Sequence, residues 1–166
     1  MGRPAMKRHP ALQDLSRDHF FVLLKCQLVR RALARGAPAN ELQALADDFL
    51  HFFDSDMVAH FREEDDFVVP EAERTGDAHL RDVAREIHAD HEWLKQRFAD
   101  LRSPADLASA LQEIEGRLTR HVRLEEEQLF EGVQRSLTEA ELQAMWARSF
   151  GFRKANRAPA ACRIRP

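Results

Sequence analysis

The sequence predicts an all-α fold, an up-down-up-down four-helix bundle with a short extra C-terminal helix. Apolar residues recur at steps of three and four along most of the chain, which is the spacing of one helix face. Only six glycines and seven prolines occur in 166 residues, fewer than a protein of many short strands and turns would need. The length suits a single core, so we expect residues 1–151 to form the helical domain and residues 152–166 a basic, flexible tail.

The first two helices are indicated by apolar stripes. The first stripe covers residues 12–33 and is followed by a glycine and a proline that end the helix. Asn40 and Gln43 have the spacing of a capping box, which predicts the start of the second helix. Its stripe covers residues 49–67 and stops near Pro70, which predicts a helix of about 30 residues.

The third and fourth helices follow after short breaks. A third stripe covers residues 80–101. Ser103 is the expected N-cap, with Pro104 at the first helical position and Asp106 in an acidic first turn, and the fourth stripe covers residues 107–129. Four helices with short connections pack in alternating directions, which gives the up-down-up-down arrangement.

A fifth, shorter helix is expected near the C-terminus. Thr138 and Glu141 form a second capping box, and the apolar positions after it predict a helix that ends around Gly151.

Charge and cysteine usage exclude several classes of protein. There are 25 Lys and Arg against 28 Asp and Glu, and this balance provides no basic surface for nucleic acid or an anionic membrane. No run of about 18 apolar residues is present, and the basic start lacks an apolar signal core, so we expect a cytoplasmic protein and no membrane partner. Cys26 and Cys162 form no metal or disulfide motif, and Cys26 is expected to be a small core residue rather than a reactive thiol.

Polar residues interrupt the apolar stripes at regular places. Each of the four stripes carries one histidine, and two stripes carry a glutamate four residues after it: His19, His60 with Glu64, His91, and His121 with Glu125. A spacing of four places each His and Glu on one helix face. Burying these groups without compensation would cost several kcal/mol per ion, and a metal bound by imidazoles and carboxylates would remove that cost.

The pattern repeats along the chain. A helix with an Asp-His step, Asp18-His19 or Asp90-His91, is followed each time by a helix with a His-x-x-x-Glu step. The repeat predicts a pseudo-twofold site in which each half supplies two imidazoles and one carboxylate. Counting residues to the loops places the histidines within roughly 5 to 9 Å of a common level, which a site for two metals can span.

The residues before and after these histidines and glutamates allow two interpretations. Asp18 and Asp90 are expected either to accept the free imidazole N–H of a ligand or to be solvated helix charges. The acidic residues next to the glutamates are expected to form a solvated face, with an entry path for the metal as the alternative: Glu63, Asp65, Asp66, Glu126 and Glu127. An apolar wall around the site is expected from Phe20, Phe53, Leu94, Phe98 and Leu129.

The ordered set of His and Glu residues resembles the hemerythrin-like (HHE cation-binding) family over roughly residues 14–131. The resemblance implies a four-helix bundle with two iron ions in a non-haem di-iron centre, bridged by carboxylates and an oxo or hydroxo group. It also implies the ligands His19, His60, Glu64, His91, His121 and Glu125. A ferritin-like di-iron site is disfavoured, because no Glu lies three residues before any histidine. A zinc hydrolase would need an open three-ligand site, which the doubled ligand set does not match.

His88 leaves the coordination open. Oxygen-carrying hemerythrins have two histidines four residues apart on the third helix, whereas His88 and His91 are three apart and Ile87 stands at the fourth position. With His88 as a ligand, one iron is saturated, as in the oxygen carriers. Without it, each iron keeps an open position, as in relatives linked to nitric oxide and iron-centre repair.

The resemblance implies a metal-binding protein rather than a dedicated enzyme. The first expectation is a di-iron protein that binds O2 or a related small oxidant at an open iron position, for oxygen binding, sensing or a redox response. The alternative is an oxidoreductase or iron-handling stress protein that acts on nitric oxide (NO) or peroxide, or repairs iron centres. The partner is therefore a small diatomic ligand, and the sequence leaves open whether the chain forms an oligomer.

Overall fold

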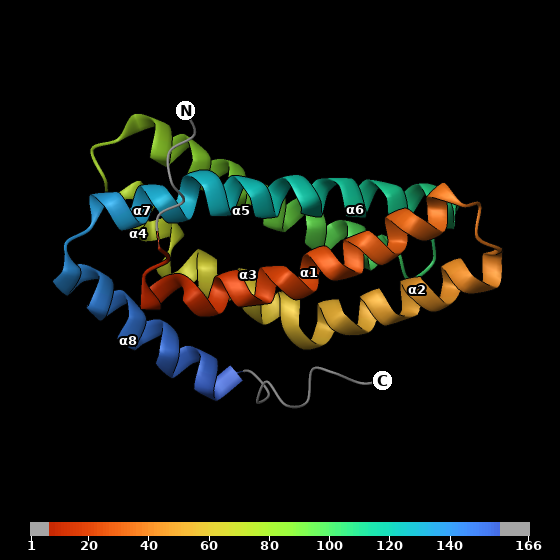
Figure 1. Ribbon diagram of the computed structural model, residues 1–166, viewed down its shortest axis with the longest axis horizontal. Coiled ribbons are helices and arrows are strands. Elements are labelled where there is room, and N and C mark those ends of the chain that lie inside the picture. Colours follow the sequence, from red (N-terminus) through yellow and green to blue (C-terminus); the bar gives the residue numbers. More distant parts are fainter. Residues whose placement is uncertain (1–6, 157–166) are drawn as a thin grey trace.

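The computed structural model describes residues 7–156, which form helices joined by short connections and contain no strand (Figure 1). Four long helical segments run side by side in alternating directions, and this confirms the predicted bundle with an added C-terminal helix (Figure 1). Two of the segments are single helices, α1 (Pro10–Ala34) and α5 (Ala78–Asp100). The other two are composite: α2 (Ala39–Phe52), η1 (Phe53–Met57) and α3 (Val58–Phe67); and α6 (Leu107–Leu124), η2 (Glu125–Leu129) and α7 (Phe130–Ser136). The short α4 (Val69–Glu73) follows α3, and α8 (Glu139–Asn156) follows α7.

The predicted capping box at the start of α8 is confirmed, whereas the N-cap of α6 is Asp106 rather than the predicted Ser103. The Asp106 side chain accepts the backbone N–H of Ser109 at 3.1 Å, and Thr138 and Glu141 form the reciprocal contacts of a capping box. The predicted box at Asn40 and Gln43 is wrong. Helix α2 begins directly after Pro38, whose backbone carbonyl accepts the first hydrogen bonds of the helix, so Asn40 already lies in the first turn.

Two π-helical turns, η1 and η2, lie within the composite segments. A π turn contains one residue more than an α turn and therefore shifts the buried face. The sequence carries this shift as two successive steps of four between buried residues: Phe49, Phe53 and Met57 at η1, and Glu125, Leu129 and Val133 at η2. Because of these turns, the buried stripe continues on the inward face past each point where a regular helix would rotate it away.

The core consists of two hydrophobic clusters at the two ends of the bundle. One includes Val22, Cys26, Phe49, Phe98 and other buried residues of α1, α2, α5 and α6. The second lies at the opposite end of the bundle and includes buried residues of α1, α4, α5, α7 and α8. On every long segment, the predicted ligand residues fall between the two clusters, so a polar layer crosses the middle of the bundle.

Helix α8 packs against α1 and α3 and extends further than expected (Figure 1). It continues through the exposed Gly151 to Asn156, so residues 152–156 belong to the helix rather than to a tail. These added residues pack against the bundle. The ring centroids of Phe152 and Phe67 are 5.7 Å apart, and Arg153 pairs with buried carboxylates. Residues 157–166 of the expected tail lie outside the described residues. None of the described helices combines the length and apolar character needed to cross a bilayer.

Candidate metal centre

The four histidines and two glutamates that interrupt the apolar stripes meet in the middle of the bundle. All six side chains are buried, each at most 2% exposed. They form two overlapping groups whose ligand atoms lie within 4.8 Å of one another: His19, His60, Glu64 and Glu125; and Glu64, His91, His121 and Glu125. The two glutamates belong to both groups. This is the arrangement of two adjacent metal positions with two shared carboxylates.

The Glu64 carboxylate lies between the two histidine pairs. Its Oε1 atom is 3.3 Å from the Nε2 of His60 and 3.6 Å from that of His19. Its Oε2 atom is 3.4 Å from the Nε2 of His91. One oxygen of Glu64 therefore faces each metal position.

Glu125 repeats the arrangement from the other side. Its Oε1 atom lies 3.1 Å from the Nε2 of His121 and 3.6 Å from that of His91, and its Oε2 atom lies 3.1 Å from the Nε2 of His19. This residue is the first of η2, so the wide turn begins at the ligand itself. The pseudo-twofold relationship predicted from the repeat is present at the level of individual oxygen atoms.

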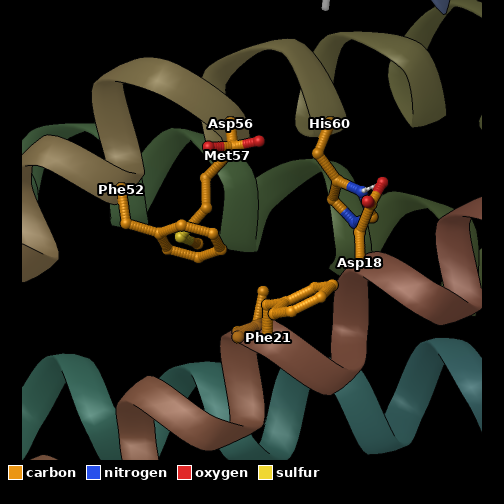
Figure 2. A pocket seen from close by; sticks show the side chains of 7 residues that line it. Asp18, Phe21, Phe52, Asp56, Met57 and His60 are labelled. Atoms are coloured by element: carbon orange, nitrogen blue, oxygen red, sulfur yellow. Dashed lines mark hydrogen bonds and ion pairs between the residues drawn. The ribbon is translucent and has the colours of Figure 1, made fainter. Parts of the chain in front are cut away.

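The aspartates of the two Asp-His steps contact histidines of neighbouring helices. Asp18 Oδ2 lies 3.2 Å from the Nδ1 of His60 (Figure 2). Asp90 Oδ2 lies 3.4 Å from the Nδ1 of His121. Both aspartates are buried, which settles the choice between a contact to imidazole and a solvated charge. A carboxylate at Nδ1 fixes the ring orientation and leaves Nε2 free to bind a metal.

Two contacts of the same kind were missed by sequence reasoning. Asp65 Oδ1 lies 2.9 Å from the Nδ1 of His91, and Glu126 Oε1 lies 2.7 Å from the Nδ1 of His19. The prediction of a solvated acidic face is wrong for Glu63, which is 1% exposed, and for both Asp65 and Glu126. Asp65 and Glu126 each directly follow one of the shared glutamates, and this second repeat in the sequence was the available signal. All four imidazoles thus have a carboxylate on the side opposite the cluster.

The charges of the cluster stabilise one another in the absence of metal. Burial lowers the pKa of His19, but Glu125, Glu126 and Glu64 outweigh it and raise the pKa well above 6.5. The pKa of His91 is likewise raised against burial by Asp65, Glu125 and Glu64. Burial raises the pKa of Glu125, but the facing histidines outweigh it and hold that pKa well below its usual range. The carboxylates are therefore ionised and ready to bind a cation.

The comparison with protein families agrees with this geometry. The model of the hemerythrin HHE cation-binding domain matches residues 11–146, which include all six residues of the cluster. The chain belongs to the hemerythrin HHE cation-binding family. No curated protein and no solved structure matches the chain.

The cluster of this HHE domain fits a bound cation. Among the described residues, both carboxylate oxygens of Glu64 and of Glu125 are buried without a hydrogen-bond partner, and so are the Nε2 atoms of His91 and His121. Orphaned buried polar atoms are costly in a folded protein. His19 and His60 direct their Nε2 atoms at each other across 3.1 Å. Such a set of converging carboxylate oxygens and imidazole nitrogens is satisfied by metal ions, which replace the imidazole protons, and the overlap of the two groups fits a binuclear site.

His88 lies apart from both groups of the HHE domain. Its side chain is 57% exposed, and its Nδ1 contacts Asp65 at 3.0 Å. Asp65 separates it from the cluster, because the same carboxylate oxygen contacts His91. The structure thus brings six of the seven predicted site residues together and places the seventh at the surface.

The apolar surroundings of the centre differ from the expected wall at one position. Phe53, Leu94, Phe98 and Leu129 are buried, but Phe20 is 65% exposed, because it lies on the outer face of α1 next to the inward-facing His19. The aromatic rings that contact the imidazoles are others. Phe61 stacks on His91 with ring centroids 4.2 Å apart, and Phe130 stacks on His19 at 5.5 Å.

Proposed function

We propose that the chain is a non-haem di-iron protein that binds O2 or a related small oxidant at an open iron position. The observation that carries this proposal is the placement of Glu64 and Glu125, each with one oxygen toward each pair of histidines. The proposed ligands are His19, His60, Glu64, His91, His121 and Glu125. Two imidazole nitrogens and two carboxylate oxygens per metal leave positions of an octahedron open for a small ligand.

The iron pair would supply Fe(II)/Fe(III) redox chemistry, and the chain's own residues control the surroundings. Asp18, Asp65, Asp90 and Glu126 hold the imidazole rings with Nε2 toward the cluster. Stacked phenylalanines and the two hydrophobic clusters limit the access of water from both ends. Exclusion of water favours reversible binding over release of a reduced oxygen species.

A second candidate function is favoured by the position of His88. Without a third imidazole on either metal, both iron positions are open, and the resemblance associates this arrangement with relatives that act on nitric oxide or handle iron. In that case the protein would consume NO or peroxide, or take part in iron-centre repair, rather than bind O2 reversibly.

Iron reconstitution tests the proposal. Anaerobic protein loaded with Fe(II) should bind two iron ions per chain, one for each of the two groups. Glu125→Ala should reduce the bound iron at both positions, because this carboxylate is shared, whereas Glu127→Ala at an exposed neighbour should not. A chain that binds no iron, or a Glu125→Ala variant with undiminished iron, would contradict the di-iron assignment.

Absorption spectra distinguish the two candidate functions. A spectrum that changes on exposure to air and returns when O2 is removed supports reversible binding. Irreversible oxidation without a stable adduct, together with turnover of NO or peroxide, supports the second candidate. Two measurements test the identity of the metal. Elemental analysis of protein purified without added metal shows which metal the protein retains, and parallel loading with Zn²⁺ and Mn²⁺ shows whether the site also accepts these ions.

A further inference from the structure

The C-terminal helix α8 reaches the polar contacts around His60 through one arginine. Arg153 Nη1 lies 3.0 Å from Asp18 Oδ2, the same oxygen that lies 3.2 Å from His60 Nδ1. The Arg153 side chain is only 15% exposed, and that of Asp18 is 8% exposed. Arginine, carboxylate and imidazole therefore form one continuous, largely buried series that ends at the cluster.

The half of the centre that contains His121 has a similar series of arginine, carboxylate and imidazole, but its arginine lies on a different helix. Arg117 donates from Nε to Asp90 Oδ1 at 2.7 Å, and the other oxygen of Asp90 faces His121. Arg117 precedes His121 by four residues and lies on the same helix, α6. This half therefore takes its arginine from within the bundle.

The His60 half has no equivalent arginine on its own helix. The residue four positions before His60 is Asp56, a carboxylate. Asp56 and Asp18 line the same small pocket beside His60, together with Phe21, Phe52 and Met57 (Figure 2). A second carboxylate at this position cannot neutralise Asp18, and within residues 7–156 Arg153 of α8 supplies a cation there.

Further contacts fix this part of α8 against the bundle. Arg153 Nη2 lies 2.8 Å from Glu63 Oε2, and Ser149 donates its hydroxyl to Glu63 Oε1 at 2.6 Å. Glu63 is 1% exposed and precedes the shared ligand Glu64. One guanidinium thus joins α1 and α3, the two helices that carry His19 and His60.

We propose that Arg153 is a positioning residue for His60, so that the metal position formed by His19 and His60 depends on the docked helix α8. The position formed by His91 and His121 does not. This inference rests on the proposed metal site. Arg153 holds the Asp18 carboxylate at the Nδ1 of His60, which keeps the Nε2 lone pair directed at the metal.

Metal titration of the full chain tests the inference. Anaerobic Fe(II) binding is measured by equilibrium dialysis with elemental analysis, and Co²⁺ absorption serves as a second probe. Arg153→Met should weaken one of the two metal equivalents by about 10- to 100-fold and leave the other unchanged. Arg148→Met is the matched control, because it removes the 2.7 Å contact of α8 with Glu71 without touching Asp18, and both equivalents should keep their affinity.

Double variants identify which half is affected. In a His121→Ala background, Arg153→Met should still weaken the remaining equivalent. In a His60→Ala background it should have no further effect. Arg153→Lys should restore part of the affinity, since an ammonium group keeps the charge near Asp18.

Three outcomes would overturn the inference: equal weakening of both equivalents by Arg153→Met, an equal effect of Arg148→Met, or unchanged binding in every variant. Circular dichroism of the metal-free variants monitors folding, and Asp18→Asn breaks the same series from α1 if Arg153→Met unfolds. A wild-type chain that binds no metal would refute the proposed function itself. Two metals in the wild type with unchanged binding in Arg153→Met would refute only the role of α8.

Discussion

Asp65 contacts the Nδ1 of His91 at 2.9 Å, on the side of the ring opposite to Glu64. The carboxylate is only 16% exposed, although it belongs to an acidic run on a helix surface. It also lies 3.8 Å from the ammonium group of Lys95. Of these two consecutive acidic residues, Glu64 points into the cluster, and Asp65 lies behind His91, a proposed ligand on the neighbouring helix α5.

Replacement of Asp65 by asparagine should weaken metal binding. The amide keeps the shape but loses the negative charge that orients His91 and increases its basicity, so we expect about 10- to 100-fold lower affinity. Asp66→Asn is the control, because Asp66 is exposed and pairs with Arg62 on the same helix at 3.5 Å. Competition with a metal chelator gives the affinities. Equal affinities of the two variants would assign Asp65 to the solvated face instead.

His88→Ala should leave metal stoichiometry and the spectrum of the loaded protein unchanged. The His88 side chain is largely exposed and contacts the cluster only through Asp65, which keeps its contact with His91. His91→Ala is the positive control and should lose metal. Loss of iron or of the small-ligand adduct in His88→Ala would mean that His88 moves inward and binds iron when the site is loaded.

The metal-free protein should lose stability as the pH rises above 6.5. Facing carboxylates raise the pKa of His19 and His91 well above 6.5, so the folded state binds protons that the unfolded state releases. This stabilisation is complete below pH 6.5 and is lost as the pH passes the raised pKa values. Urea unfolding between pH 6 and about 9 measures the effect.

Bound metal should reverse this pH dependence. Metal ions bind deprotonated imidazole, so affinity and the linked stability increase over the same pH range. His19→Leu provides a control in the metal-free state, because it removes one of the histidines whose pKa is raised and should reduce the pH dependence. If the metal-free wild type gained stability with rising pH, its histidines would be neutral and the charge network described above would be absent.

The thiol of Cys26 should be protected in the folded protein. Burial raises the pKa of the Cys26 thiol to about 12, and its side chain lies in the hydrophobic cluster at 1% exposure. In a Cys162→Ser variant, a thiol reagent at about pH 8 should react with Cys26 only after denaturation. Fast reaction of the native protein would show that the hydrophobic cluster around Cys26 opens readily.

The bundle could be predicted from the sequence because its signals are local. Steps of three and four mark each helix, and Thr138 with Glu141 marks the start of α8 within four residues. The six cluster residues were predictable for a related reason. A histidine on an apolar stripe, such as His60, has to face the core, and all four stripes share one core.

The outer contacts could not be predicted because they depend on how neighbouring helices rotate against one another. Asp18 contacts His60 on another helix rather than the adjacent His19, and no spacing within one helix indicates this. Arg153 contacts residues more than eighty positions earlier in the chain. The end of α8 was placed too early because Gly151 was interpreted as a stop, whereas Phe152 and Arg153 have partners that continue the helix.

The wide turn η2 has a consequence for changes in chain length. It accommodates one residue more than an α turn, directly between Glu125 and Phe130, the ring that stacks on His19. Deleting one residue there, such as the exposed Glu127, would convert η2 into a regular α turn and leave Phe130 and the rest of α7 on their present face, whereas a one-residue deletion within the regular helix α6 would rotate them by about 100°. The wide turn should therefore tolerate the loss of a single exposed residue far better than the regular helix before it.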